Sequence, residues 1–587
     1  MKLTTNKTLI TLSLAAAISG CSQLANTNDT AEAIYYGGTV ITMNDDSPIA
    51  QSVAVSDGKI IAVGDEATIK KNFASSDTNL IDLDGHTLMP GFIDSHSHFV
   101  AAGMKKATVE MDPAPAGRVN NIKDIQNLFS WELAKRDEDS TDWLIGTGYD
   151  AVFLEEGRHP TRHDLDAIST DTPILLIHFS GHQAVANSYL LEMMNIDENT
   201  LDPEGGTYQR EDGSNVPNGV LEEAAWFPFY YIFLQTLGHD LDSRPENFIQ
   251  DLTKALVVDI QKDYAQAGYT TITEQGMVPS TYHLVKELAD NNKLYLDVGG
   301  SLFMKGEDAS VEDIRAIYSA EYENHFRVLG GKASLDGGTP GRTGYLREAY
   351  QPQFEGEENY AGFLSMSVEQ YNRHISEYYQ ADIPLYVHAL GDAALDVALD
   401  GIEAALEVSP TGEYRRTQLI HTHLIADEQF DRIEAVDSTI TFQMPHSFYY
   451  ADFHASQRLG VARTEALLPA KTAFDRGIST TIHHDAPVSP IGQLDLISQS
   501  VNRTSRSGKV WGADERLSVM EALKASTINA AYQYYEEDRK GSLEVGKLAD
   551  MVILDSNPLE IEPALLKDIQ VIETIKEGNT VYSIEQN

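Results

Sequence analysis

An apolar segment that ends in two histidines constrains the fold of this chain most. Residues 88–99 read LMPGFIDSHSHF. If these histidines continue a β-strand, side chains alternate between its two faces, so His96 and His98 point the same way and can bind one metal ion. Phe92 and Ile93 supply the apolar part of the strand. A strand that finishes in metal-binding residues is typical of the first strand of a (β/α)8 barrel, whose chemistry lies at the C-terminal strand ends.

Further short apolar segments end in residues of the same chemical kind. They are Leu385–His388, Leu419–His421 and Ile478–Asp485, and each is followed by helix-like sequence. Lys332 lies in a similar segment, Phe326–Leu335, just before the turn-like Asp336-Gly337-Gly338. Ligand-type residues on successive strand ends predict an α/β fold, a (β/α)8 TIM-like barrel that carries a metal site.

At these motifs the chain resembles the amidohydrolase superfamily, in particular the family-3 group of YtcJ-like proteins and N-substituted formamide deformylases. Further matching segments are SGHQAVANSYLL, GKASLDGGTPGRT, VHALGDAALD, RTQLIHTHL, HHDAPVSP and KGSLEVGKLADMVILD. The resemblance extends from about Ala33 to Ser583. It implies a metal-dependent hydrolase with one or two divalent ions, and neutral imidazoles and carboxylates suit zinc.

The resemblance also implies which histidines bind metal. His96 and His98 look like ligands of the more buried ion. His388 and His421 look like the ligands of a second metal position on the fifth and sixth barrel strands.

Lys332 and Asp485 complete the implied metal centre. Lys332 falls where such enzymes often carry a lysine carboxylated on its amine, which bridges two metal ions. Glu274, which closes the apolar segment TTITEQG, is the rival for this bridging role. Asp485 is similar to the aspartate that binds metal and takes the proton from the attacking water, as a general base within reach of that water would.

Three positions depart from the family pattern. Ile420-His421 stands where the family usually has Glu-His, and His423 stands where glutamine is frequent. His483-His484-Asp485 stands where the family usually has Gly-Ser-Asp. Because residues two apart on a strand share a face, His423 and His483 can face inward together with His421 and Asp485.

The first strand and the Glu274 segment are separated by roughly 170 residues, far more than one β/α unit needs. We expect an inserted subdomain at about 108–263 that covers the metal-bearing face and helps to build the substrate pocket. Candidate substrate-binding residues in family-matching motifs are Tyr149, Asp150, His182 and Arg342.

Both ends of the chain are rich in short β-like segments. Residues 33–86 and 541–587 are therefore expected to form one small composite β-sandwich, and residues 87–540 the barrel with its insertion.

The first 21 residues have the layout of a secretory signal, because a lysine-containing start precedes the apolar Leu9–Ile18. Cys21, the only cysteine of the chain, ends ISGC, which resembles a bacterial lipobox, and it would become the lipidated first residue. Residues 22–32 would then be a tether. Since Ser22 is not the aspartate associated with inner-membrane retention, we expect a lipid-anchored, periplasm-facing protein of the bacterial outer membrane.

Charge and resemblance bound the function. With 43 basic and 89 acidic residues the net charge is −46, which argues against nucleic-acid binding. The resemblance implies hydrolysis of a small-molecule, amide-type C–N bond other than a peptide bond. The alternatives are ring opening of a cyclic amide or deamination by the same site, or a solute-binding lipoprotein that has lost turnover. A homo-oligomer is compatible with the sequence.

Overall fold

The computed structural model describes residues 23–24, 30–136, 143–181, 183–203, 206–226, 228–229, 248–303, 310–353 and 358–586. Cys21, the signal segment before it and His182 lie outside the described residues.

Eight parallel strands form the central sheet, and their spatial order follows the chain. They are β9 (Phe92–Ile93), β16 (Tyr269–Met277), β17 (Asp297–Phe303), β18 (Phe326–Ser334), β19 (Leu385–Ala389), β20 (Gln418–His421), β21 (Thr439–Gln443) and β22 (Thr480–His483). The sheet curls so that its two edge strands approach each other. The backbone N–H of His98, after β9, donates to the carbonyl of Ala486, after β22, at 2.8 Å. The expected α/β barrel architecture is confirmed.

Helices cover the outside of this sheet. They include α2 (Phe99–Lys105), α7 (Phe248–Gln266), α8 (Pro279–Asp290), α9 (Val311–Ile317), α10 (Val368–Ala381), α11 (Asp392–Val408), α12 (Asp427–Ala435), α15 (Ala470–Asp475), α16 (Gln493–Asn502) and α17 (Val519–Ala525). Their buried apolar faces share one core with the strands, as parallel strands covered by helices require. In the described ranges, no helix combines the length and the apolar character needed to cross a membrane.

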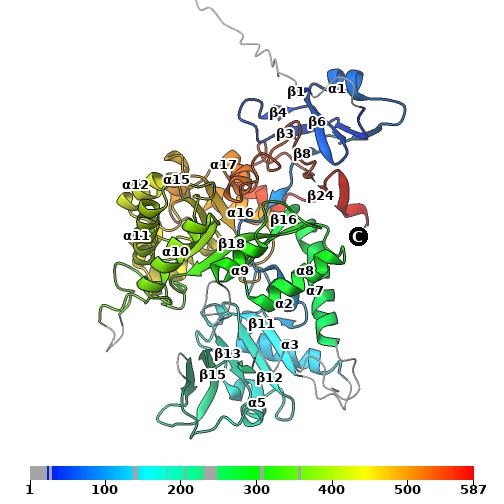
Figure 1. The fold of residues 1–587 in the computed structure, drawn as a ribbon. Coiled ribbons are helices and arrows are strands. Elements are labelled where there is room, and N and C mark those ends of the chain that lie inside the picture. Colours follow the sequence, from blue (N-terminus) through cyan, green and yellow to red (C-terminus); the bar gives the residue numbers. More distant parts are fainter. Residues whose placement is uncertain are drawn as a thin grey trace, which may run out of the picture.

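A separate mixed sheet lies at one end of the barrel (Figure 1). Its strands are β10 (Val109–Glu110), β11 (Leu144–Tyr149), β12 (Ile174–His178), β13 (Gln183–Ala186), β15 (Pro217–Glu223) and β14 (Gly206–Arg210). It occupies most of the expected insertion. Helix α7, which begins at Phe248, falls mostly within the range expected for the insertion. Its Val257, Ile260 and Tyr264 are buried in the barrel core, so this helix belongs to the barrel.

Two further sheets lie at the opposite end (Figure 1). One contains β1 (Gln23–Leu24), β6 (Lys59–Gly64), β5 (Ser52–Ser56), β2 (Ala33–Tyr36) and β7 (Asn79–Asp82). The other contains β25 (Asn579–Ser583), β24 (Val571–Lys576), β23 (Met551–Leu554), β8 (Thr87–Pro90), β3 (Thr39–Ile41) and β4 (Ile49–Ala50). The second sheet thus combines strands from both ends of the chain.

Gly91 is the point where the chain passes from this terminal sheet into the barrel. β8 falls within the range expected for the barrel, 87–540, but it pairs with β23 of the terminal sheet, and β9 begins after Gly91. A Cβ at position 91 would approach Cγ2 of Thr270 to 2.3 Å, so only glycine lets the chain pass β16 this closely.

A buried ionic cluster joins the barrel to the C-terminal strands. Asp297, at the start of β17, accepts hydrogen bonds from Nζ of Lys540 at 2.6 Å and of Lys576 at 2.8 Å. Lys576 also donates to Asp550 at 3.0 Å. Burial raises the pKa of Asp297, but the two ammonium groups outweigh it and hold the pKa well below its ordinary value. Asp297 is therefore ionised, and it neutralises cations that have no access to water.

We predict that Asp297→Asn lowers the free energy of unfolding by about 3–5 kcal/mol, because it removes the carboxylate that two buried ammonium groups share. Urea unfolding at pH 7 measures this. Asp45→Asn, which breaks the ion pair of Lys524 with an 82%-exposed aspartate, is the control and should change stability by less than about 1 kcal/mol. Equal effects of the two substitutions would contradict the prediction.

The effect should also depend on pH. Since the folded state lowers the pKa of Asp297, its stabilisation is present above the unfolded aspartate pKa of about 4 and is lost as pH falls through the folded value. The stability difference between the parent and Asp297→Asn should therefore shrink in acid.

Candidate metal centre

The two histidines of the first motif lie beyond the end of β9 rather than on it. β9 ends at Ile93, and the side chain of Asp94 hydrogen-bonds to the backbone that follows. Its Oδ1 accepts from the N–H of His96 at 3.1 Å. Its Oδ2 accepts from Oγ1 of Thr273 in β16 at 2.8 Å. The premise that His96 and His98 share a strand face was therefore wrong, since the Asp94 side chain turns the chain away from strand geometry.

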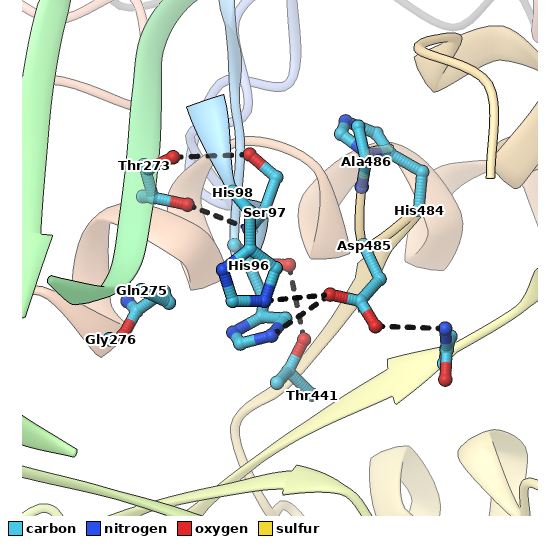
Figure 2. A network of polar contacts seen from close by, with 12 residues as sticks. His96, Ser97, His98, Thr273, Gln275, Gly276, Thr441, His484, Asp485 and Ala486 are labelled. Carbon is cyan, nitrogen blue, oxygen red and sulfur yellow. Dashed lines mark hydrogen bonds and ion pairs between the residues drawn. The ribbon is translucent and has the colours of Figure 1, made fainter. Parts of the chain in front are cut away.

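His96 and His98 nevertheless converge on Asp485 (Figure 2). Nε2 of His96 lies 3.1 Å and Nε2 of His98 lies 3.5 Å from Oδ1 of Asp485. His421, at the end of β20, joins them: His96, His421 and Asp485 each offer a ligand atom, and these atoms lie within 4.8 Å of one another. All three residues are buried. The turn after β9 and the ends of β20 and β22 thus meet at one point.

The chemistry of these donors fits a divalent cation. Burial lowers the pKa of His96 and His421 well below the ordinary value and that of His98 to about 4, so the three imidazoles are neutral at pH 7 and keep a lone pair. Burial raises the pKa of Asp485, but His96, His98 and His483 outweigh it and lower the pKa well below its ordinary value. Metal ligands must be deprotonated in this way.

The closest contact in the group also resembles a pair of ligands. Nε2 of His96 and Oδ1 of Asp485 have no hydrogen-bond partner among the described residues, although they are 3.1 Å apart. A buried imidazole nitrogen and a buried carboxylate oxygen at this distance are placed as two ligands of one ion would be. The other carboxylate oxygen, Oδ2, accepts from Nε2 of Gln443 at 3.0 Å, which fixes the plane of the carboxylate.

Backbone strain accompanies this convergence. His421 has φ 74° and Asp485 has φ 60°, in the left-handed region that L-residues seldom occupy. Such conformations persist where the surrounding structure determines them, and they concentrate at functional sites. Here they turn both side chains at the ends of β20 and β22 toward the metal group.

Lys332 and Glu274, the two candidates for the bridging role, both lie beside the metal group. Lys332 is 3% exposed, and burial lowers its pKa to about 8, although the charges of Asp485 and Glu274 oppose that shift. A fraction of its amine is therefore uncharged near neutral pH. Oε2 of Glu274 accepts from the N–H of Val100 at 2.6 Å, and Oε1 lies 4.0 Å from Nδ1 of His98. Burial raises the pKa of Glu274 to about 7.

His388 lies next to the group without joining it. Its ring centroid is 4.4 Å from that of His421, but its Nε2 is 3.4 Å from Oδ1 of Asp336 and 3.3 Å from the carbonyl of Gly337. His423 and His484 also take other partners. Nδ1 of His423 contacts Oγ1 of Thr339 at 3.1 Å.

His484 faces away from Asp485, as Figure 2 shows. Its Nδ1 accepts from the N–H of Ala486 at 2.9 Å, and its ring packs against Tyr264 and Tyr269. This orientation makes it a poor candidate for the general base.

The inserted sheet contacts the barrel through Asp150. Its Oδ2 accepts from Oη of Tyr450 at 2.8 Å, and its Oδ1 lies 3.3 Å from Nε2 of His178. Tyr450 ends the π-helix η2 (His446–Tyr450), which closely follows β21. Tyr149 contacts Nδ1 of His159 at 2.9 Å through its hydroxyl.

Arg342, the remaining described pocket candidate, lies over the rings of Tyr360 and Tyr350, at 5.0 and 5.7 Å from their centroids.

Sequence reasoning missed three residues of the site. Gln443 has a detectable signal, because it ends a barrel strand in register with His483. His178 and Tyr450 have none, since their contacts with Asp150 join distant segments.

The amidohydrolase family model matches residues 79–582. The chain belongs to the amidohydrolase family. It is 28% identical to the amidohydrolase named YtcJ of Bacillus subtilis (strain 168), over 94% of this chain and 99% of that protein. It is 25% identical to the N-substituted formamide deformylase of Arthrobacter pascens, over 92% of this chain and 97% of that enzyme.

Solved structures share the fold. The uncharacterised metal-dependent hydrolase of Pyrococcus furiosus has a TM-score of 0.67 at 24% identity and covers 90% of this chain and 100% of its own. Its counterpart from Pyrococcus horikoshii has a TM-score of 0.68 at 22% identity, covering 90% of this chain and 99% of its own. At family level, the expectations of an amidohydrolase fold and of a hydrolase that acts on C–N bonds are confirmed.

We predict that Lys332→Ala reduces the metal content of the purified protein, because its uncharged amine can be carboxylated and then bridge two ions. Short carboxylic acids added to this variant should restore part of the metal. Elemental analysis of the parent, Lys332→Ala and Glu274→Gln compares the two candidates. Loss of metal in Glu274→Gln but not in Lys332→Ala would assign the bridge to Glu274.

Proposed function

We propose that this protein hydrolyses an amide-type C–N bond of a small molecule with a divalent ion, zinc, held by His96, His98, His421 and Asp485. The observation that carries the proposal is the position of the Asp485 carboxylate. Its Oδ1 lies within 3.5 Å of Nε2 of both His96 and His98, and Gln443 fixes the orientation of the carboxylate by donating to Oδ2. Such a set combines metal ligands and a proton acceptor in one place.

When bound, the ion supplies Lewis acidity for the substrate carbonyl and makes a water molecule a better nucleophile near neutral pH. Asp485 accepts the proton of the attacking water at its carboxylate and then delivers it to the leaving nitrogen. Gln443 donates to Oδ2, so Oδ1 is the oxygen on the side of the metal group.

The inserted sheet would supply the walls of the substrate pocket. Asp150 is already saturated by hydrogen bonds from Val152 and Tyr450 and by its contact with His178. It is therefore better suited to fixing Tyr450 and His178 than to binding a substrate cation directly. Tyr149 and Arg342 remain candidates for substrate contacts.

The relatives support an acyl-amide substrate. The Arthrobacter pascens enzyme is named as an N-substituted formamide deformylase and matches over nearly its whole length. N-formyl and N-acyl amines are accordingly the first compounds to test.

The test is a panel of N-formyl amines, N-acyl amines and cyclic amides, assayed with the zinc-loaded protein and with the chelated protein. We expect metal-dependent hydrolysis of at least one class. Asp485→Asn should retain part of its metal and lose turnover by ~10²- to 10⁴-fold, the usual contribution of a general base, whereas His96→Ala should lose the metal.

Two results would oppose the proposal. One is the absence of metal-dependent turnover across the panel. The other concerns the base alone: parental turnover in metal-loaded Asp485→Asn, together with a loss in His484→Ala, would transfer the base role to His484.

Lipid anchoring and a periplasm-facing position at the outer membrane are also proposed, on the basis of the signal-like residues 1–21 and the ISGC lipobox. Cys21→Ser should leave the protein unprocessed or release it from membranes, while the purified protein keeps its activity, because none of the proposed metal ligands is a cysteine. Membrane fractionation with immunoblotting measures this, and unchanged membrane retention and processing would refute the anchor.

A further inference from the structure

His483 is the last residue of β22 and lies two positions before Asp485. Where the family usually has glycine, this chain places an imidazole inside the barrel. Because side chains alternate along a strand, Thr481 and His483 lie on the same face of β22. Oγ1 of Thr481 donates to Oε1 of Gln533 at 2.7 Å in the buried interior. His483 therefore points into the barrel from the strand that carries Asp485.

The ring of His483 contacts two residues of the metal group. Its centroid is 4.9 Å from that of His96 and 4.9 Å from that of His421, with interplanar angles of 78° and 55°. The side chain is completely buried. An additional histidine ring thus packs against both His96 and His421, whose own centroids are 5.1 Å apart.

The nitrogens of His483 set it apart from the other buried histidines. Among the described histidines, only His96 and His483 have two buried ring nitrogens that both lack a hydrogen-bond partner. His484, His423 and His446 each have a partner: the N–H of Ala486, Oγ1 of Thr339 and Nε2 of His454, respectively. A neutral imidazole offers one donor and one acceptor, and leaving both unpaired in the interior is unfavourable.

We propose that His483 is a further metal ligand, in addition to the set assigned by family resemblance. The inference rests on the metal centre of the proposed function. Coordination would use the lone pair of one ring nitrogen, which accepts no hydrogen bond. A glycine at this position has no such nitrogen. The added imidazole gives this chain a more nitrogen-rich centre, whose donors, from the turn after β9 and the ends of β20 and β22, are His96, His98, His421, His483 and Asp485.

Metal binding tests the proposal without any substrate. Apo protein, prepared with a chelator, is titrated with Zn²⁺ in competition with a chromophoric chelator, and separately with Co²⁺ while its visible absorption is recorded. For His483→Gly we expect the Zn²⁺ Kd to rise by more than the ~10- to 100-fold that loss of a residue merely hydrogen-bonded to a ligand produces. The Co²⁺ spectrum should change with the loss of a nitrogen donor, and added imidazole should partly restore it.

His484→Ser is the matched control, because it removes the neighbouring imidazole and introduces the residue that the family usually has there. It should bind Zn²⁺ with the parental Kd. His483→Asn serves if His483→Gly does not fold, and circular dichroism of the apo proteins checks the fold. A parental Zn²⁺ Kd and a parental Co²⁺ spectrum in a folded His483 variant would overturn the proposal. A protein that hydrolyses no amide but loses metal affinity in these variants would refute the proposed function alone.

Discussion

The carboxylate of Asp94 is the contact on which the metal centre depends. Strand β9 has only two residues, so it cannot by itself hold the histidines that follow. Asp94 is 1% exposed and binds the backbone of His96, the hydroxyl of Ser97, and both the N–H and the hydroxyl of Thr273. One buried carboxylate thus ends the strand, ties the turn to β16 and sets where both imidazoles lie.

The rest of the centre is arranged around that turn. His421 and Asp485 come from the ends of β20 and β22, and each adopts a left-handed backbone conformation as its strand ends. Burial lowers the pKa of the His96 and His421 imidazoles, and interactions with His96, His98 and His483 lower the pKa of Asp485 despite its burial. The donors are therefore in the protonation states that a cation needs, and the barrel fixes them by packing and hydrogen bonds.

Sequence patterns predict the parts of this structure that depend on local features. The apolar segments that end in His388 and His421, and the segment Phe326–Leu335 that contains Lys332, correspond closely to β19, β20 and β18. A parallel strand buried on both faces has a continuous apolar sequence between turn residues. The turn at Asp94 escaped prediction, since its hydrogen bonds reach Thr273, far along the chain. The same limit applies to the Tyr450–Asp150 contact. The expected end of the insertion, about residue 263, falls inside helix α7, because the spacing between two strands does not say which core the residues between them pack against.

The pairing of β8 with β23 has a consequence for the order in which the chain can fold. The carbonyl of Asp550 accepts from the N–H of Gly91, and Met551 lies opposite Pro90, only a few residues before the histidine turn. These partners follow all eight barrel strands along the chain. A nascent chain that has already produced every barrel strand still lacks the support for its first one. The turn that bears His96 and His98 therefore gains this support only after β23 has been made, and we expect metal capture by these histidines to follow that step.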